Sequence, residues 1–438
     1  MNIAPVSELL PGEAPPQVWR LPALVVAFTK RFLALLVLGS LALPLLLPYL
    51  LLRPWMGRPP HVPTTARFLW FLGRILGERP PSGPLGPRLR LALLLMWAQQ
   101  LCLVPLFSMA WYLDRLLYGR LLDAQTIVAP FFELSAARSG STQLAHHLEE
   151  DPHFVAPNIM QFLFPYLWLW KLAPRTVGRL FTKEQIQNFA LRQVPEVYLE
   201  RHELDPYCTD TFEVPFLALH LGALSMGLGA EVMKLTLSAT VQSPWNRAIW
   251  EQDLPDYIES LGKKLLLWRG EPCRLMIKGH FLGSAEALER RFPDALFLTM
   301  IRDPAKRIQS TLNFHRCQPG DSLVGPPRWA ELVAYDLPEE IAYCKLEQSW
   351  FMSGDTKKKM VVRFEDYRRD LPGSLRRVYQ ELLQQPERAQ PVAHTARKRS
   401  GYSVDRSLEQ VGVDPAELEK VLATYRQWCA GGDGVSSL

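Results

Sequence analysis

The fold is decided by one stretch of the chain, FFELSAARSGST, which runs from Phe131 to Thr142. An apolar run that favours a strand extends from about Thr126 to Leu134, and a helical pattern begins near Ser141. The small residues between them predict a tight turn. A strand that passes through such a turn into a helix gathers backbone N–H groups at the positive end of the helix dipole. This stretch therefore predicts an anion-binding site.

The side chains of this turn suit a phosphate group. Arg138 supplies a full positive charge, and Ser141 and Thr142 supply short hydroxyl donors at the start of the helix. Ser139 and Gly140 are the small residues that form the turn itself. We therefore predict that residues 138–142 bind a phosphorylated cofactor.

The rest of the catalytic part repeats the alternation of strand and helix. From about Gln125, short strand-like runs alternate with helical patterns, which predicts an α/β fold in three layers around a parallel sheet. The aromatic run from Phe162 to Trp170 is interpreted as core, with a membrane-facing or acceptor-facing surface as the alternative. The candidate strands are Ile127–Leu134, Arg274–Lys278, Ala295–Ile301 and Met360–Phe364.

The first 120 residues differ from the rest of the chain. Phe32–Leu52 is a charge-free and mainly apolar run, and Leu91–Leu113 is a second one. Each is close to the roughly 20 residues that cross a bilayer as a helix. We therefore assign residues 1–120 to a membrane-associated hydrophobic helical hairpin and residues 121–438 to the catalytic domain, with a soluble core helix as the alternative reading of the apolar runs.

The side of the membrane stays open at this stage. The segment between the two apolar runs, Arg53–Arg90, carries seven arginines and one glutamate. The positive-inside tendency would keep this segment cytoplasmic and place both termini, with the catalytic domain, on the other side of the membrane. The chain contains no N-x-S/T sequon, which argues mildly against a glycosylated lumen. An in-plane hairpin with a cytoplasmic catalytic domain satisfies both observations. Localisation is accordingly predicted as membrane, either of Golgi type or associated with the cytoplasmic face.

Composition excludes some classes of partner. The chain has 438 residues and a net charge of +5, with no basic tail and no basic–aromatic array, which argues against nucleic acid. A mildly basic balance suits an anionic cofactor or an anionic lipid. The six cysteines have no metal-ligand spacing, so no metal site is predicted.

Two further motifs follow downstream. Lys278 and His280 stand at the C-terminal end of a buried strand, which is the edge where open parallel sheets bind ligands. The next strand ends in Arg302, Asp303 and Pro304. Aspartate is a good N-cap and proline a good first helical residue, so a helix is predicted to start there and to carry Ser310 downstream.

In this order and spacing the motifs resemble those of sulfotransferases that use 3′-phosphoadenosine 5′-phosphosulfate (PAPS). The resemblance implies that residues 138–142 hold the 5′-phosphosulfate of the donor, and that Arg302 and Ser310 hold its 3′-phosphate. The basic segment around Lys398 resembles the family's basic–glycine segment over the 3′-phosphate, with an ordinary solvated face as the alternative.

Other parts of the chain fit the same family. The Lys278-x-His280 pair resembles the Lys-x-His of the cytosolic enzymes. The overall layout is nearer to the broad bacterial and membrane-linked sulfotransferase group. The resemblance covers roughly residues 125–425, and it implies a P-loop-like fold.

The implied reaction is an in-line displacement at sulfur, in which positioning and charge stabilisation dominate. The attacking hydroxyl or amine must lose a proton, and an imidazole such as that of His280 suits the role of general base. Lys278 would lie beside the bridging oxygen and offset charge on the departing phosphate. No metal is required. The predicted acceptor is a carbohydrate, a lipid or a small molecule.

One departure from the family bears on the base. Many bacterial and membrane-linked relatives carry a glutamate shortly after the first helix, and Gln161 stands in its place here. An amide cannot take up the proton, so the role shifts to His280, with Glu213 and Asp210 in reserve.

Two other functions compete with sulfuryl transfer. The first is a nucleotide-dependent phosphotransferase or kinase, although the turn lacks the G-x-x-x-x-G-K-[ST] pattern and no acidic residue is obviously placed for Mg²⁺. The second is a membrane-tethered, non-catalytic scaffold with a degenerate site.

Overall fold

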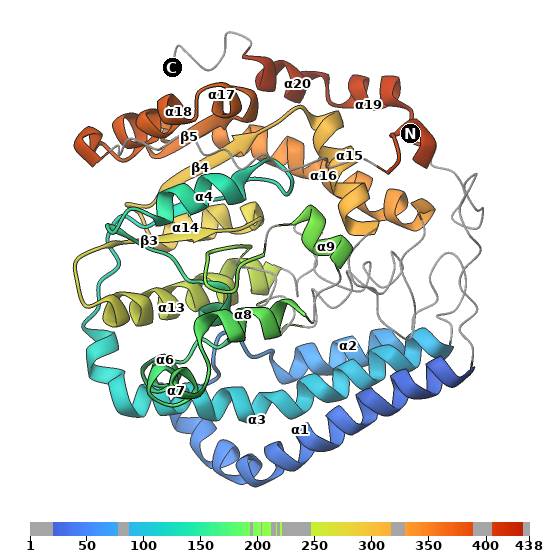
Figure 1. The fold of residues 1–438 in the computed structure, drawn as a ribbon, viewed down its shortest axis with the longest axis vertical. Coiled ribbons are helices and arrows are strands. Elements are labelled where there is room, and N and C mark those ends of the chain that lie inside the picture. Colours follow the sequence, from blue (N-terminus) through green and yellow to red (C-terminus); the bar gives the residue numbers. More distant parts are fainter. Residues whose placement is uncertain are drawn as a thin grey trace.

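The computed structural model describes residues 21–77, 87–192, 196–202, 204–211, 216, 220, 247–316, 329–388 and 405–431. Within these residues the chain forms a parallel sheet of five strands in the order β2-β3-β1-β4-β5 (Figure 1). The strands are β1 (Phe131–Glu133), β2 (Phe154–Val155), β3 (Arg274–Lys278), β4 (Leu296–Ile301) and β5 (Lys359–Arg363). Because β1 lies between β3 and β4, the carboxyl ends of these three strands meet at one edge, which we call the sheet edge.

Helices cover both faces of the sheet, which makes the three layers predicted from the sequence. One face carries α4 (Ser141–Glu149), α17 (Phe364–Arg369) and α18 (Leu371–Arg377). The other carries α13 (Leu254–Arg269), α14 (Ala285–Arg291) and α16 (Trp329–Phe351). The remaining described α-helices of the catalytic part are α5 (Ile159–Leu163), α6 (Leu167–Leu172), α7 (Val177–Leu180), α8 (Lys183–Leu191), α9 (Glu196–Arg201), α15 (Pro304–Arg316), α19 (Pro415–Val421) and α20 (Ala423–Ala430).

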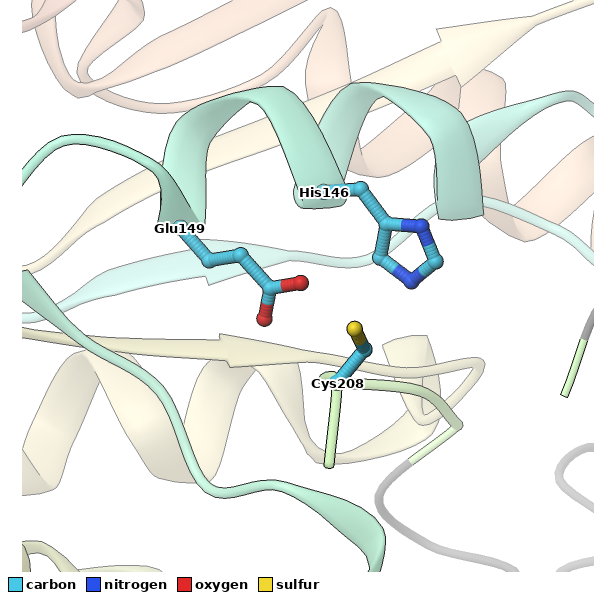
Figure 2. Close-up of side chains that lie close together, drawn as sticks. All are labelled: His146, Glu149 and Cys208. Atoms are coloured by element: carbon cyan, nitrogen blue, oxygen red, sulfur yellow. The ribbon is translucent and has the colours of Figure 1, made fainter. Parts of the chain in front are cut away.

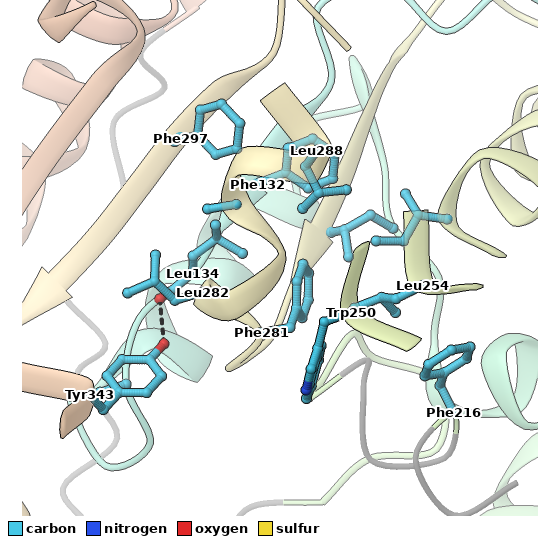
Figure 3. Packing of buried hydrophobic residues seen from close by; sticks show 14 of the residues in the cluster. Phe132, Leu134, Phe216, Trp250, Leu254, Phe281, Leu282, Leu288, Phe297 and Tyr343 are labelled. Atoms are coloured by element: carbon cyan, nitrogen blue, oxygen red, sulfur yellow. Dashed lines mark hydrogen bonds between the residues drawn. The ribbon is translucent and has the colours of Figure 1, made fainter. Parts of the chain in front are cut away.

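The strand side chains alternate between two hydrophobic clusters. Phe131 packs with α4 and α18, whereas its neighbour Phe132 packs with α14 on the opposite face (Figure 3). Both phenylalanines are completely buried. A parallel sheet covered on both faces needs such continuously apolar strands. This explains why FFE, rather than an alternating pattern, marks the central strand.

The predicted strands are confirmed with small changes. Strand β3 has the predicted bounds, and β4 and β5 each start one residue away from the predicted position. Strand β1 is shorter than predicted because Ala129 has a positive φ of 43° and Pro130 follows it, so the ladder starts only at Phe131. Strand β2 is only two residues long and was not predicted.

The N-terminal region consists of α1 (Leu21–Met56), α2 (Thr65–Gly77) and α3 (Pro87–Asp123), with α1 and α3 packed side by side (Figure 1). Within the described residues, Phe28–Met56 and Arg90–Asp123 are long and apolar enough to cross a membrane, with mean hydropathies of 2.3 and 1.7. Only 11% of the most apolar window of the first stretch is buried. These helices form the predicted hairpin, while length and composition alone give weak support for a membrane crossing.

The second half of α3 is also part of the catalytic core. Tyr112 and Asp114 are completely buried, and the Asp114 carboxylate accepts hydrogen bonds of 2.8 Å from the backbone N–H groups of Leu167 and Trp168 at the start of α6. The same carboxylate lies 2.8 Å from the ammonium of Lys264 in α13. The predicted domain boundary near residue 120 thus falls inside a continuous helix, and it stays a prediction.

The aromatic run at 162–170 lies mainly in the core, as predicted. Phe162, Tyr166 and Trp170 are buried, whereas Leu163 and Phe164 are exposed. The Trp170 indole donates a hydrogen bond of 2.7 Å to the carbonyl of Phe164, so the run folds on itself. An acceptor-facing surface made of the whole run is therefore wrong.

Candidate active site

The predicted anion-binding turn connects β1 to α4 at the sheet edge. Arg138 and Gly140 both have positive φ, of 64° and 98°. A Cβ atom on residue 140 would lie 2.7 Å from the ring of Phe364 and 3.2 Å from the sulfur of Met300, so only glycine fits. The Ser139 hydroxyl donates to the carbonyl of Ala136 at 2.7 Å and holds the turn closed. The turn is thus fixed by its own bonds and by a glycine that cannot be enlarged.

Helix α4 begins at Ser141, as predicted, and its N-cap is Gly140, which has no side chain to cap the first N–H groups. Ser141 is buried and Thr142 is half-buried. The first turn of this helix therefore offers backbone donors and the positive dipole end to an anion. Ser139 contributes to the shape of the turn rather than an outward donor, because its hydroxyl is directed to Ala136.

The structure brings Arg138, Arg302 and Ser310 together. The Arg138 Nε donates to the Ser310 hydroxyl at 3.1 Å, and the Arg302 guanidinium donates to the Arg138 carbonyl at 2.9 Å. The two guanidinium groups lie over aromatic rings, Arg138 over Phe314 at 4.8 Å and Arg302 over Phe364 at 4.6 Å. The predicted 5′-phosphosulfate turn and the predicted 3′-phosphate pair therefore adjoin each other.

The helix that carries Ser310 starts as the sequence predicts. Asp303 precedes α15, and its carboxylate accepts a hydrogen bond of 3.0 Å from the backbone N–H of Lys306. Pro304 is the first residue of the helix. This cap sets the direction of α15, so that Ser310 and Phe314 lie on the side facing Arg138.

Lys278 lies at the end of β3 and is almost completely buried. Its ammonium lies 3.3 Å from the Asp210 carboxylate and donates to the Thr211 hydroxyl at 3.1 Å. The adjacent strand places Glu133 in register with it, and burial raises the pKa of this glutamate to about 7 although Lys278 and Ser135 lower it. Neither carboxylate partner of Lys278 is evident from the sequence, because Asp210 is 68 positions away.

His280 contacts the turn from the neighbouring strand. Its Nδ1 lies 2.6 Å from the carbonyl oxygen of Ser135. A carbonyl only accepts, so Nδ1 carries the proton and the lone pair is left on Nε2. Burial, with the charge of Lys278 as the second cause, lowers the pKa of His280 to about 3. The imidazole is therefore neutral near pH 7, which is the state that a general base requires.

Asp210 and Glu213 are the reserve candidates for the general base, and the structure describes only Asp210. Burial opposes ionisation of Asp210, but Lys278 and His202 outweigh it and hold the pKa of Asp210 far below its usual value. Both of its oxygens are engaged, one by Lys278 and the other by His202 at 2.7 Å. Glu213 and the predicted cofactor residue Lys398 lie outside the described residues. Gln161 closes a helix-capping box with Asn158, so its amide has a structural partner.

A cluster on α4 holds the segment that carries Asp210 (Figure 2). Polar atoms of His146, Glu149 and Cys208 lie within 4.8 Å of one another, which is close enough to hold a metal ion. However, the Nε2 of His146 lies 3.0 Å from the carbonyl of Thr209 and donates its proton there, so this nitrogen has no lone pair for a metal and only Nδ1 keeps one. Glu149 accepts from the Thr209 N–H at 2.9 Å. We therefore interpret the cluster as a hydrogen-bonded support for residues 208–211.

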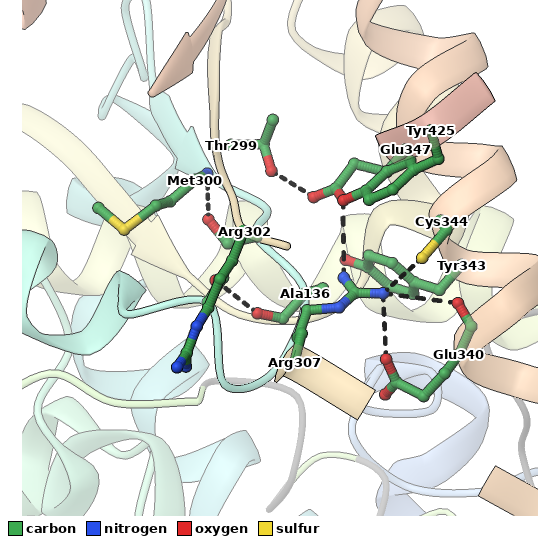
Figure 4. A network of polar contacts seen from close by, with 12 residues as sticks. Ala136, Thr299, Met300, Arg302, Arg307, Glu340, Tyr343, Cys344, Glu347 and Tyr425 are labelled. Carbon is green, nitrogen blue, oxygen red and sulfur yellow. Dashed lines mark hydrogen bonds and ion pairs between the residues drawn. The ribbon is translucent and has the colours of Figure 1, made fainter. Parts of the chain in front are cut away.

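A second network lies beneath the turn (Figure 4). The buried carboxylate of Glu347 accepts hydrogen bonds from Thr299, Tyr425 and the backbone of Ala136, and it lies 3.7 Å from the Arg307 guanidinium. Arg307 is completely buried and also pairs with Glu340 at 3.1 Å. The network joins β4, α15, α16 and α20 to the first residues of the turn. Sequence analysis missed it, because its members are far apart along the chain.

Taken together, the sheet order and the turn define the class of three-layer α/β proteins with an anion site at the edge of a parallel sheet. The model of the sulfotransferase family matches residues 130–383, more than half of the chain. The chain therefore belongs to the sulfotransferase family.

The solved structures that are similar to this chain include two mycobacterial sulfotransferases. Sulfotransferase STF9 from Mycobacterium avium has a TM-score of 0.55 at 18% identity, with 82% of this chain and 95% of that chain covered. Sulfotransferase STF1 from Mycobacterium tuberculosis has a TM-score of 0.55 at 16% identity, with 82% and 93% covered. At such identities the likeness shows the fold. No curated protein matches the chain.

Proposed function

We propose that the protein transfers a sulfuryl group from PAPS to a hydroxyl or amine of a lipid, carbohydrate or small-molecule acceptor. One observation supports this most directly: Arg302 and Ser310 both contact Arg138 at the sheet edge, and His280 contacts the same turn through Ser135. Two guanidinium groups, a hydroxyl and an uncapped helix N-terminus suit a nucleotide with two separate phosphate positions. A phosphotransferase that uses an ATP-like nucleotide would not need the second phosphate position, because such a nucleotide has no 3′-phosphate.

In this proposal the chain supplies binding, proton uptake and charge. The donor supplies an electrophilic sulfur and a phosphate leaving group. The turn at residues 138–142 holds the phosphosulfate, and Arg302 with Ser310 holds the 3′-phosphate. The Nε2 of His280 takes the proton from the acceptor as the bond from sulfur to the acceptor oxygen or nitrogen forms and the bond from sulfur to the bridging oxygen breaks. Lys278, from the neighbouring strand end, offsets the charge that develops on that oxygen.

The low pKa of His280 fits this role once the donor is considered. The charge of Lys278 is one cause of the shift to about 3. Negative phosphate groups placed beside Lys278 act in the opposite direction and raise the pKa of the imidazole. A base that is neutral before binding and stronger after it couples proton uptake to the presence of the donor.

We further propose that the protein acts at a membrane, of Golgi type or on the cytoplasmic face, and that its acceptor is hydrophobic or delivered by the membrane. The support is the outer face of α1, where large apolar side chains such as Leu43 and Leu47 are 71% and 65% exposed. Contiguous apolar surfaces of this kind mark contact with a membrane or a partner.

The nucleotide is tested by thermal shift on the full chain in detergent. We expect 3′,5′-adenosine bisphosphate to stabilise the protein, and ADP with Mg²⁺ to stabilise it much less. Arg302→Ala should remove most of this preference, whereas Arg290→Ala, an exposed arginine of α14, should leave it unchanged. Stabilisation by ADP with Mg²⁺ alone would instead favour the phosphotransferase. Transfer of a labelled sulfuryl group from the donor to members of a panel of lipids and glycans then identifies the acceptor.

A further inference from the structure

Helices α6, α7 and α8 form an unusually exposed apolar surface on the catalytic part. Large apolar side chains of this segment point to solvent, with Leu180 at 76% and Phe189 at 70% exposed. The others are Leu172, Val177 and Phe181. We call these residues, together with the basic residues between them, the α6–α8 surface. Single exposed apolar residues are normal, but several within one short segment indicate a contact surface.

Basic residues alternate with these apolar ones. Arg175, Arg179 and Lys183 are all exposed, and Glu184 is the acidic residue among them in the range 172–189. A surface with apolar side chains and an excess of positive charge matches the interface of a bilayer that contains anionic lipids. A face that binds a second protein copy would bring these like charges close together.

The same surface adjoins the hairpin. Asp114 of α3 caps α6, and the Trp168 indole donates to the carbonyl of Ala110 in α3 at 3.0 Å. The ammonium of Lys171 lies 4.4 Å above the ring of Tyr118 in α3. Figure 1 shows α6 and α7 beside the C-terminal half of α3. In that half of α3, Leu116 and Leu117 are exposed. Exposed apolar side chains therefore occur on two neighbouring segments, the C-terminal half of α3 and α6–α7.

We propose that the α6–α8 surface docks onto the anionic face of the same bilayer that the hairpin enters. The inference rests on the membrane location proposed above. Leu180 and Phe189 enter the boundary between headgroups and acyl chains, and Arg175, Arg179 and Lys183 contact lipid phosphates. The catalytic part then has a second point of attachment, which fixes how the sheet edge faces the membrane.

The test uses photocross-linking of the full chain in vesicles of phosphatidylcholine and phosphatidylserine with radiolabelled acyl chains. The photoreactive residue p-benzoylphenylalanine replaces Leu180 or Phe189 in separate variants. Leu47 of α1 serves as the positive position, and Met352, an apolar residue that is 49% exposed after α16, serves as the negative one. We expect lipid adducts at positions 47, 180 and 189, and at most background labelling at position 352.

The outcomes separate the two proposals. Adducts at position 47 without adducts at 180 and 189 overturn this inference and leave the hairpin proposal standing. No lipid adduct at any position overturns both. Adducts between two protein chains at 180 or 189 would show that the surface is an interface between copies, and equal labelling at position 352 would show unspecific contact, so either result contradicts docking.

Charge provides an independent readout. The triple variant Arg175→Gln, Arg179→Gln, Lys183→Gln should lower adduct formation at position 180 in vesicles with phosphatidylserine, by about five-fold for each residue that contacts the lipid surface. In pure phosphatidylcholine the variant and the parent should behave alike. The control Arg368→Gln, Arg369→Gln removes exposed basic residues of α17 and should have no effect. An unchanged yield in the triple variant would contradict the electrostatic part of the proposal.

Discussion

At the sheet edge, charged side chains are buried and paired, whereas the outer face of α1 presents apolar side chains to its surroundings. Lys278, Arg307 and Glu347 are each at most 1% exposed. Leu47, in contrast, is 65% exposed. Buried charges persist only with partners and hydrogen bonds, and a wide apolar surface persists only away from water. The two regions thus point to two different surroundings for one chain, and the following predictions test that contrast.

The largest effect is expected at the sheet edge. His280→Ala should lower the rate of sulfuryl transfer by about 10²–10⁴-fold, because it removes the proposed proton acceptor. Steady-state transfer from labelled donor measures it, and binding of 3′,5′-adenosine bisphosphate should change little. The matched control His153→Ala replaces a histidine that pairs with Asp151 near β2. A variant at position 280 that keeps the parent rate would rule out this base.

The second largest effect is expected in the buried network of Glu347 and Arg307 beneath the turn. Glu347→Ala leaves the buried Arg307 guanidinium with one carboxylate partner fewer and should lower the free energy of unfolding by about 3–5 kcal/mol. Urea titration measures the change. The control Glu381→Ala breaks the exposed pair with Arg377 and should cost at most about 0.5 kcal/mol. Equal losses of unfolding free energy in the two variants would show that the buried Arg307 does not depend on Glu347 for its stability.

The hairpin provides the third test. Leu47→Asp places a charge inside the apolar stretch of α1, and a charge there costs up to about 2.5–3.5 kcal/mol of insertion free energy in a bilayer. We expect the variant to be extracted from membranes by carbonate while the parent is retained. Met352→Asp, at an exposed apolar position of the catalytic part, should be retained like the parent. Retention of both variants would mean that the outer face of α1 does not contact lipid.

The smallest effect, taken over one pH unit, concerns pH. The pKa of His280 is about 3 in the folded protein and 6.5 in its ordinary state, so the unfolded chain binds more protons between these values. Stability should therefore fall as the pH drops below about 6.5, by up to about 1.4 kcal/mol per pH unit for this group. In urea titrations at several pH values, His280→Ala should show a smaller decrease of unfolding free energy per pH unit than the parent, because the contribution of this imidazole is gone. His220, with a similarly lowered pKa, contributes equally in both proteins, and identical slopes would refute the assignment.

The sequence predicts those features of the fold that depend on neighbouring residues. The apolar strands, the Asp303 cap and the turn with Gly140 each follow from local propensity and sterics. Such patterns also indicate which strand ends meet, because parallel strands share one edge. The meeting of Arg138 with Ser310 was predictable only through the resemblance to a family.

What the sequence does not predict is the pairing of distant polar groups. Asp210 contacts Lys278 across 68 positions, and Tyr425 contacts Glu347 across 78. The sequence contains many basic and hydroxyl residues that could pair with each carboxylate. Only the fold determines which of them lies within contact distance. The same limit applies to Ser139, which lies in the predicted cofactor-binding stretch and whose hydroxyl donates to the carbonyl of Ala136 within the turn.

The buried pair of Asp114 and Lys264 has a consequence for the choice of acceptor. It joins a helix of the hairpin directly to a helix under the sheet, with both charges at most 1% exposed. If the hairpin enters a bilayer as proposed, this buried pair limits rotation of the sheet relative to the hairpin, and the proposed base His280 would stay at one height over the bilayer plane. The enzyme would then select acceptors by the length of their headgroup, because only some lengths bring the reacting group to the imidazole.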